Sequence, residues 1–393
     1  MIEIIGGMRT PIGKFGGALL PLRAVELGAH AVKSTLEYTG VSPGDVDICS
    51  VGLARQAGNG PNPGRLVAIA GGLPPTAPAF TVQQACLSGM LAISTAANAL
   101  AQGEGDVALA AGVEHMSSVP HLSFDMRWGT RMGNASLADA MFVDGFMDPM
   151  TGKLMGELTE AIAGRYGISR EEQDEFALRS QQRWAAARQS GADAALISSV
   201  AIEGRGKPVL FDTDEQPRPD SSLESLAKLR PAFEKSGTVT PGNACGLADG
   251  AAATVLATSE AVKRLELRSR ARIIGFAQAA VDPADFPIAP VSSTRKLLAR
   301  LGMRIGDFDY IEANEAFAAQ MIACIRDLDI DEERLNVWGG AIAIGHPIAM
   351  SGIRIVLNLV HQLETLGGRY GLAMICGNGG QGASIAIERV DRA

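Results

Sequence analysis

Two cysteines and one histidine stand in segments that suit nucleophilic chemistry. Cys86 follows the polar pair Gln83-Gln84 and opens a helical pattern that runs to about Gln102. A thiol in the first turn of a helix lies where unpaired backbone N–H groups and the helix dipole favour an anion. These conditions lower the pKa of a thiol and create a thiolate nucleophile. Free cysteines are more often buried and inert, so simple packing is the alternative for Cys86.

A general base for this thiol is expected from His346, which stands in the Gly-rich, apolar segment Gly339–Pro347. Imidazole exchanges a proton near neutral pH, although a lone histidine is more often structural. Asn314 follows the strand pattern Tyr310–Ala313. Its amide at that position either orients a water or an oxyanion, or caps the next helix.

The other cysteine of interest, Cys376, begins the segment Cys376-Gly377-Asn378-Gly379-Gly380-Gln381-Gly382. These glycines are similar to a phosphate-binding loop, but no Lys-Ser or Lys-Thr pair follows them, and the next pattern is a strand, Ala383–Glu388, rather than a helix. We expect instead that backbone N–H groups of this segment approach a reacting carbonyl.

The elements that must position these residues alternate between strands and helices. The helix that starts at Cys86 carries no charged residue, which predicts burial on all sides. A strand opens the chain, a helix follows at about Leu22–Tyr38, and further strands are expected at Asp47–Gly52, near residue 80 and at Asp106–Val113. This alternation predicts a layered α/β half.

The C-terminal part repeats the N-terminal part. Three pairs of segments match in the same order and at nearly constant spacing: Gly40–Ile48 with Gly302–Tyr310, Ser88-Gly89 with Ser351-Gly352, and Val107–Gly112 with Leu372–Gly377. A duplicated α/β unit accounts for all three. Because ligands of open α/β sheets gather at the carboxyl ends of strands, Cys86, His346 and Cys376 are expected to be neighbours.

The segment between the halves differs in character, with scattered Met, a charged helix at Ser169–Gln189 and Pro-rich turns. We therefore predict three parts. Residues 1–118, completed by 246–268, form the N-terminal half; residues 119–245 form an insertion over the core; and residues 269–393 form the C-terminal half.

Composition narrows the class of protein. The 393 residues carry a net charge of −8, which gives no electrostatic case for nucleic acid or an anionic membrane surface. The five cysteines are widely spaced without a CxxC pair, so neither disulfides nor a metal site is expected. With no signal peptide or membrane-spanning run, a cytoplasmic protein is predicted. Cys49 and Cys324 are expected to pack in the core.

Together these segments resemble the thiolase family (acetyl-CoA acetyltransferases and 3-ketoacyl-CoA thiolases). The resemblance covers nearly the whole chain and rests on four active-site blocks and several supporting segments: the Cys86 context, Asn314–Phe317, Gly345–Pro347 and the Cys376 loop, with Arg9–Pro11, Ser169–Asp174, Lys228–Phe233 and Gly242–Ala244. It implies a five-layer αβαβα fold of two duplicated halves with an inserted loop domain. The implied activity is an acyltransferase reaction, a reversible Claisen condensation of acyl-CoAs or CoA-dependent thiolysis of a 3-oxoacyl-CoA through an acyl-cysteine.

The resemblance also implies roles for single residues. Cys86 would be acylated, His346 would accept its proton, and Cys376 would act as acid and base on the second thioester. His346 with an Asn314-held water would form one oxyanion site, and the backbone N–H groups of Cys86 and Asn378 the other. The residues implied to contact acyl-CoA are Arg218 near the nucleotide, Ser225, Leu229, Phe233, Met155, Phe286, Phe317 and Cys245, the last of which is ambiguous between lining and packing. Coenzyme A is then a substrate, with no cofactor or metal, and the protein would be a homodimer or homotetramer that works in fatty acid metabolism.

Several positions depart from the family pattern, and they concern the acyl group. Leu87, Leu154, Phe286 and Asn378 stand where the family usually has other residues, so acyl-chain length and branching do not follow from the resemblance. Two other functions compete with a catalytic thiolase. The first is a thiolase-like protein that binds acyl-CoA without turnover, which two cysteines and a histidine close together argue against. The second is a condensing enzyme that acts on carrier proteins, which Asn314 and Cys376 disfavour.

Overall fold

Strands from both ends of the sequence form the centre of the molecule. The computed structural model describes residues 1–203 and 207–390. One half of the main sheet has the strand order β1 (Ile2–Arg9), β12 (Ala248–Thr258), β5 (Val107–His115), β3 (Ile48–Gly52) and β4 (Ala79–Val82). The other half has the order β13 (Ala271–Ala280), β16 (Gln381–Arg389), β15 (Tyr370–Gly377) and β14 (Tyr310–Ala313).

The two halves have the same construction, so the predicted duplication is confirmed. In each half a parallel pair (β3 with β5, or β14 with β15) continues through antiparallel strands to β1 or β13. A parallel bridge between Ile311 and Leu335 takes the place of β4 in the second half. The half-sheets meet where β1 pairs with β13 over two residue pairs, Glu3 with Arg272 and Ile4 with Ala271.

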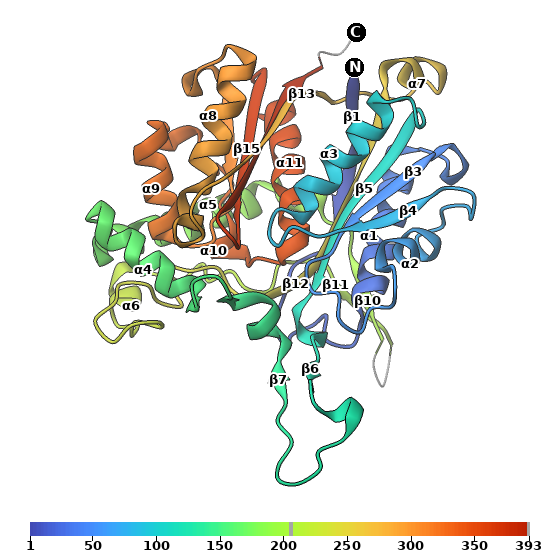
Figure 1. The fold of residues 1–393 in the computed structure, drawn as a ribbon. Coiled ribbons are helices and arrows are strands. Elements are labelled where there is room, and N and C mark those ends of the chain that lie inside the picture. Colours follow the sequence, from blue (N-terminus) through green and yellow to red (C-terminus); the bar gives the residue numbers. More distant parts are fainter. Residues whose placement is uncertain (204–206, 391–393) are drawn as a thin grey trace.

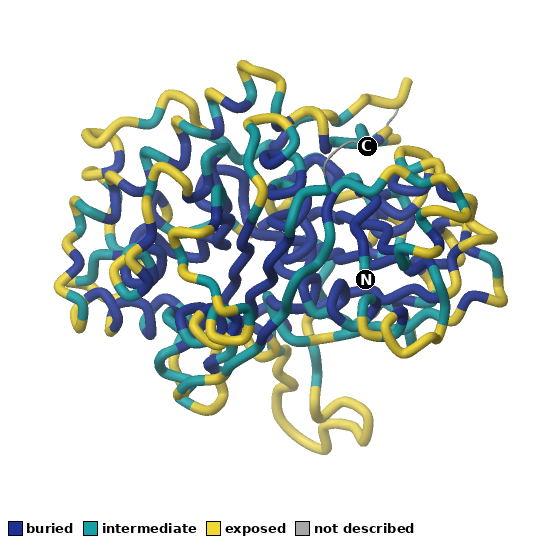
Figure 2. The backbone as a smooth tube through the Cα atoms, turned by 90° about the horizontal axis from the view of Figure 1, so that it is seen from above, coloured by how far each residue is buried: buried dark blue, intermediate teal, exposed yellow. Residues whose placement is uncertain are grey.

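Helices form three layers around these half-sheets (Figure 1). The central helices are α3 (Ser88–Ala101) and α11 (Ile348–Thr365), which lie between the half-sheets. Most of α11 is buried, whereas α3 is buried on one side and exposes Asn98 and Ala101 near its end, so the predicted burial on all sides holds only in part. Figure 2 shows that buried backbone fills the middle of the molecule. The outer pairs are α1 (Ala24–Thr39) with α2 (Pro63–Ala70), and α8 (Ala289–Leu301) with α9 (Ala318–Leu328). The expected sequence of layers, αβαβα, is therefore present. Cys49 and Cys324 are buried in the outer-layer cores, as predicted.

The repeated Ser-Gly pair explains how the central helices approach each other. A Cβ atom on Gly89 would overlap the carbonyl oxygen of Ala349, and one on Gly352 would overlap the backbone nitrogen of Met90. Only glycine permits this distance between helix backbones. The crossing lies in the first turns of both helices, so the segments that precede them, with Cys86 and His346, are brought to the same edge of the molecule.

The segment 119–245 lies over that edge and extends from it. A hairpin of β6 (His121–Leu122) and β7 (Ala138–Asp139) projects into solvent (Figures 1 and 2). It is followed by a π-helical turn (Phe142–Phe146), α4 (Met155–Tyr166), α5 (Arg170–Ser190), the antiparallel pair β10 (Val200–Ile202) and β11 (Val209–Phe211), and α6 (Leu223–Ala227). The short elements that complete the fold are β2 (Gly13–Lys14), β8 (Met147–Asp148), β9 (Lys153–Leu154), α7 (Ser259–Arg264) and α10 (Ala341–Ile344).

The predicted helix at Ser169–Gln189 is confirmed as α5, and Ser169 is its N-cap, accepting a hydrogen bond from the backbone of Glu172 at 3.2 Å. The exact domain boundaries stay a prediction. Residues 204–206 of the second part and 391–393 of the third part lie outside the described residues. Within the described ranges, none of the helices combines the length and apolar character needed to cross a membrane.

Candidate active site

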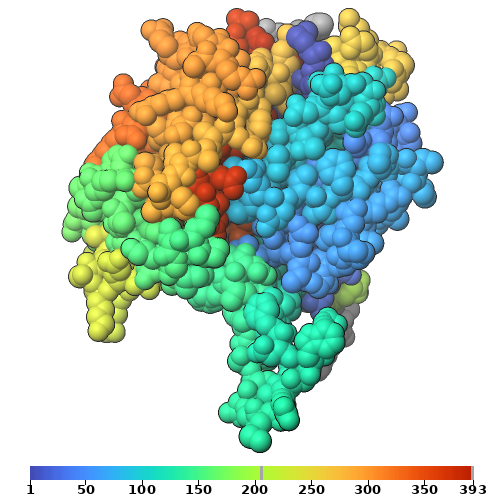
Figure 3. Space-filling view, viewed as in Figure 1, coloured from blue at the N-terminus to red at the C-terminus, as the bar shows by residue number. Residues whose placement is uncertain are grey.

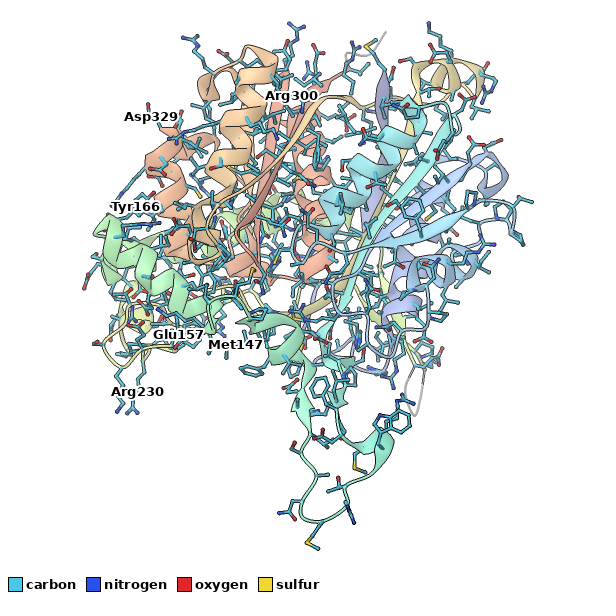
Figure 4. All side chains as sticks on the ribbon, in the orientation of Figure 1. Met147, Glu157, Tyr166, Arg230, Arg300 and Asp329 are labelled. Carbon is cyan, nitrogen blue, oxygen red and sulfur yellow. The ribbon has the colours of Figure 1, made fainter. Side chains whose placement is uncertain are left out.

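A cavity of about 700 Å³ opens where the N-terminal half, the C-terminal half and the inserted segment meet. Cys86, His346 and Cys376 all line it, which confirms that the three lie together. Its mouth is visible where the segment around residue 147 meets the strands near residue 380 (Figure 3). Met147, which also lines the cavity, lies beside this mouth, whereas Arg230 points away into solvent (Figure 4).

Cys86 lies in a strained turn ahead of α3 rather than in its first turn. The residue before it, Ala85, has a φ of +48°, which side chains other than glycine rarely adopt. Ser88 holds this turn, because its hydroxyl donates to the carbonyl of Ala85 at 2.7 Å and accepts from the backbone of Gln84 at 2.9 Å. α3 begins at Ser88, so the sequence prediction placed the helix start two residues too early.

The expected lowering of the Cys86 pKa is wrong. Burial raises the pKa of the Cys86 thiol to about 11, and the positive charge of Arg55 only partly offsets this effect. The segment that contains Val143, Phe146 and Met150 forms a wall of the cavity, and Cys86 is only partly exposed. Cys86 therefore rests as a neutral thiol, and a base must take its proton when it attacks.

His346 is placed to be that base in its neutral form. Burial, with Arg354 and Arg55 nearby, lowers the pKa of His346 to about 3. Its Nδ1 lies 2.7 Å from the hydroxyl of Ser351, which itself donates to the carbonyl of Pro347 at 3.2 Å. Because the Ser351 proton is used in that way, Nδ1–H donates to Ser351, and Nε2 keeps the free electron pair that can accept a proton.

Asn314 supports the same tautomer from the other side of the ring. Its side-chain Nδ2 lies 3.5 Å from His346 Nε2, and its Oδ1 accepts a hydrogen bond from Arg354 at 3.4 Å. Because a guanidinium only donates, this bond fixes the orientation of the amide and directs its N–H₂ group at the imidazole. Arg354 in turn is ion-paired with the buried Glu312 at 3.5 Å.

Cys376 lies near the end of β15 and is 1% exposed. Burial and the neighbouring thiols of Cys86, Cys324 and Cys245 raise its pKa well above the ordinary value. Three glutamines connect its loop to the Cys86 turn: Gln84 donates to Gln381 at 2.6 Å and accepts from Gln278 at 3.0 Å. The side chain of Asn378 donates to the carbonyl of Gly145 at 2.9 Å, which ties the same loop to the inserted segment.

The predicted substrate-contacting residues fall into two groups. Met155, Phe286, Phe317 and Cys245 line the cavity, together with Asn378. Phe233 stands behind this wall with its ring centroid 6.2 Å from that of Phe317, and Leu229 packs in the outer core of the C-terminal half. Arg218 and Ser225 are exposed on the inserted segment, outside the cavity wall.

Four of the departures from the family pattern are also placed. Phe286 and Asn378 line the cavity, but Leu87 is 0% exposed and packs in the central core, so it contacts the cavity only through its neighbours. Leu154 is half-buried at the start of α4.

Sequence reasoning missed several functional residues. Ser351, Arg354 and Gln84 position the residues described above, and Arg55 lines the cavity itself. The repeated Ser-Gly pair was a usable signal for Ser351. The one sequence signal for Arg55 was a basic residue in the Gly-containing segment that follows strand Ile48–Gly52. Its burial depends on the inserted segment, and the sequence pattern does not place that segment.

This arrangement supplies an uncharged thiol nucleophile, a neutral imidazole that accepts its proton, and a second thiol in the same water-poor cavity. Such a set suits acyl transfer to Cys86 followed by proton transfer through Cys376.

Comparison with known proteins gives a consistent result. Residues 2–260 match the family model for the thiolase N-terminal domain, and residues 267–389 match that for the thiolase C-terminal domain. The chain is 46% identical over 389 residues to an acetyl-CoA acetyltransferase of Chromobacterium violaceum, covering 99% of both chains. It is 43% identical over 393 residues, again 99% of both, to a probable acetyl-CoA acyltransferase of Staphylococcus aureus.

Solved structures agree. The acetyl-CoA acetyltransferase of Bacillus anthracis superposes with a TM-score of 0.96 at 41% identity, over 99% of this chain and 98% of that one. A human mitochondrial 3-ketoacyl-CoA thiolase in complex with CoA superposes with a TM-score of 0.95 at 37% identity, with the same coverage of each chain. The chain belongs to the thiolase family.

Proposed function

We propose that the cavity catalyses the thiolase reaction, a reversible Claisen condensation of acyl-CoAs that runs in reverse as CoA-dependent thiolysis of a 3-oxoacyl-CoA. The observation that carries the proposal is the meeting of Cys86, neutral His346 and Cys376 in one cavity. The family membership and the relatives named acetyl-CoA acetyltransferase and 3-ketoacyl-CoA thiolase support it.

In thiolysis, the sulfur of Cys86 attacks the 3-oxo carbon while His346 Nε2 takes the thiol proton. The bond between the second and third carbons then breaks, and the electron pair leaves on the second carbon. Cys376 protonates that carbon, which releases acetyl-CoA and leaves the shortened acyl group on Cys86. The thiol of a second CoA then attacks the acyl group on Cys86 and gives its proton to the Cys376 thiolate. The Cys86 sulfur leaves and takes back the proton held by His346, which restores both thiols and the neutral imidazole.

We assign two oxyanion sites, each of which would stabilise the negative charge that develops on a thioester oxygen. The imidazole of His346 and a water held by Asn314 would stabilise one thioester oxygen. The backbone N–H groups of Cys86 and Asn378 would stabilise the other. Preorganised donors of this kind contribute about 3–4 kcal/mol each when they face a developing oxyanion in a water-poor site.

Coenzyme A is a substrate in this proposal, and no resident cofactor or metal takes part, because the acyl group travels on Cys86. Arg218 and Ser225 are exposed on the inserted segment, which suits contact with CoA, Arg218 near its nucleotide. A homodimer or homotetramer, a cytoplasmic location and a role in fatty acid metabolism belong to the same proposal.

The test is thiolysis of a series of 3-oxoacyl-CoAs of increasing chain length by the wild-type chain and by Cys86→Ala. Cleavage by the wild type that is lost in the variant supports the proposal. Tight acyl-CoA binding with no cleavage of any member of the series would favour an acyl-CoA-binding protein.

A further inference from the structure

Arg55 differs from the other buried arginines. Three arginines among the described residues are buried: Arg9 at 3%, Arg55 at 7% and Arg354 at 1% exposure. Arg9 is paired with Asp214 at 2.7 Å, and Arg354 with Glu312 at 3.5 Å. No carboxylate in residues 1–203 and 207–390 lies within 4.0 Å of the Arg55 guanidinium, and its side chain makes no hydrogen bond there, with Nε fully enclosed.

The guanidinium of Arg55 lies in the wall of the catalytic cavity, which also contains Cys86. Its carbon atom is 5.8 Å from the ring centroid of Phe146, and a Cβ on Gly145 would overlap its terminal nitrogen. A cation held against an aromatic ring and a glycine in this way has few other rotamers available.

The backbone around Arg55 is held firmly as well. The carboxylate of Glu114 accepts hydrogen bonds from the backbone N–H groups of Arg55 at 2.9 Å, Ala54 at 3.3 Å and Ala349 at 3.2 Å. Glu114 is the nearby negative charge, but its oxygens are used by these three groups. Asp144, which shares the cavity wall, is exposed and forms no ion pair with Arg55 within the described ranges.

A buried cation with no carboxylate in direct contact is costly, so an anionic group that reached Arg55 inside the cavity would be bound favourably. The planar fork of arginine matches the two oxygens of a carboxylate. Arg55, Gln83 and Asp144 line both the catalytic cavity and a second hollow of about 390 Å³. An acyl chain bound to Cys86 lies in the cavity whose wall contains Arg55.

We propose that Arg55 binds a carboxylate at the far end of the acyl group, so that the preferred substrates are 3-oxoacyl-CoAs of dicarboxylic acids. This inference rests on the proposed thiolase function and names its substrate class. CoA phosphates are the other anions available. The residue expected near the CoA nucleotide, Arg218, lies on the inserted segment before α6, whereas Arg55 follows β3 in the N-terminal half (Figure 1).

The experiment compares two 3-oxoacyl-CoAs of equal chain length, one ending in a methyl group and one in a carboxylate. For each, kcat/KM for thiolysis is measured with the wild type, Arg55→Met and Arg55→Lys. The matched control is Arg127→Met, which removes the same charge from the exposed hairpin. We expect the wild type to prefer the carboxylate substrate and the ratio of the two kcat/KM values to fall about 10- to 100-fold in Arg55→Met.

The ratio should be intermediate in Arg55→Lys and should stay at the wild-type value in Arg127→Met. Equal kcat/KM values of the wild type for the two substrates would overturn the inference. An equal loss of kcat/KM for both substrates in Arg55→Met would also overturn it, because that result is expected if Arg55 binds CoA phosphate or only supports the fold. If Arg55→Met does not fold, the wild type and Arg55→Lys decide the question alone. Cleavage of neither substrate by the wild type would instead refute the thiolase function.

Discussion

Removal of the Ser351 hydroxyl tests whether one hydrogen bond sets the protonation of the catalytic base. Ser351 lies 2.7 Å from His346 Nδ1 and is itself tied to Pro347. In Ser351→Ala, the buried Nδ1–H loses its acceptor, and the proton is free to move to Nε2, where it blocks the position that must receive the Cys86 proton. The imidazole is also free to rotate.

The expected loss follows from the cost of an unsatisfied buried donor, about 1–3 kcal/mol. The variant avoids this cost by adopting the unproductive tautomer, so the productive tautomer becomes rarer by the corresponding factor. We therefore expect kcat to fall by about 5- to 150-fold. KM for the acyl-CoA should change little, because Ser351 lies behind His346 and outside the cavity wall.

The assay is steady-state thiolysis, with kcat and KM determined separately. Ser94→Ala is the matched control, since Ser94 lies in the neighbouring central helix and its hydroxyl bonds only to the carbonyl of Leu91 at 3.0 Å. Wild-type kcat in Ser351→Ala, or equal effects of the two substitutions, would refute the reasoning about the tautomer.

Three other outcomes are expected. Cys376→Ala should still form the acyl-enzyme from an acyl-CoA, but its condensation rate should fall about 100- to 10,000-fold, because only proton transfer to and from the second carbon is removed. Rapid-quench measurement of the two half-reactions tests this, and an equal loss of rate in both would contradict the assignment. Alkylation of Cys86 by iodoacetamide should become faster across pH 7 to 10, since a pKa of about 11 leaves mostly thiol in that range. A flat rate from pH 7 to 9 would mean a thiolate at rest. Gly352→Ala should lower the free energy of unfolding by about 1–3 kcal/mol, because the added Cβ meets the backbone of α3. Gly164→Ala is the control in thermal melting, since Gly164 has open space around it. Equal melting temperatures of the two variants would contradict the close crossing of the helices.

Much of the fold followed from sequence patterns because the two halves repeat. The Ser-Gly pairs alone indicated that Cys86 and His346 precede equivalent helices, and the structure adds that the glycines permit the helices to cross at that point. Strand Tyr310–Ala313 was placed to the residue, because the polar residues Asp309 and Asn314 bound it, although the strand itself contains Glu312.

The electrostatics of the site did not follow from sequence. The pKa of Cys86 depends on how far the inserted segment excludes water, and no local pattern reports that burial. The same limit applies to Arg55. That its guanidinium has no carboxylate in direct contact becomes clear only when β5, the π-helical turn and the segment after β3 are placed together. Arg218 and Ser225 were predicted by resemblance, and their exposure leaves their contact with CoA to be tested.

The central claim is that Cys86 carries the acyl group. The most direct measurement is intact-protein and peptide mass spectrometry after incubation with an acyl-CoA, followed by addition of free CoA. We predict one acyl group on the peptide that contains Cys86, lost again when CoA is added, and no adduct in Cys86→Ala. An acyl group on another residue, or thiolysis that persists in Cys86→Ala, would contradict the account.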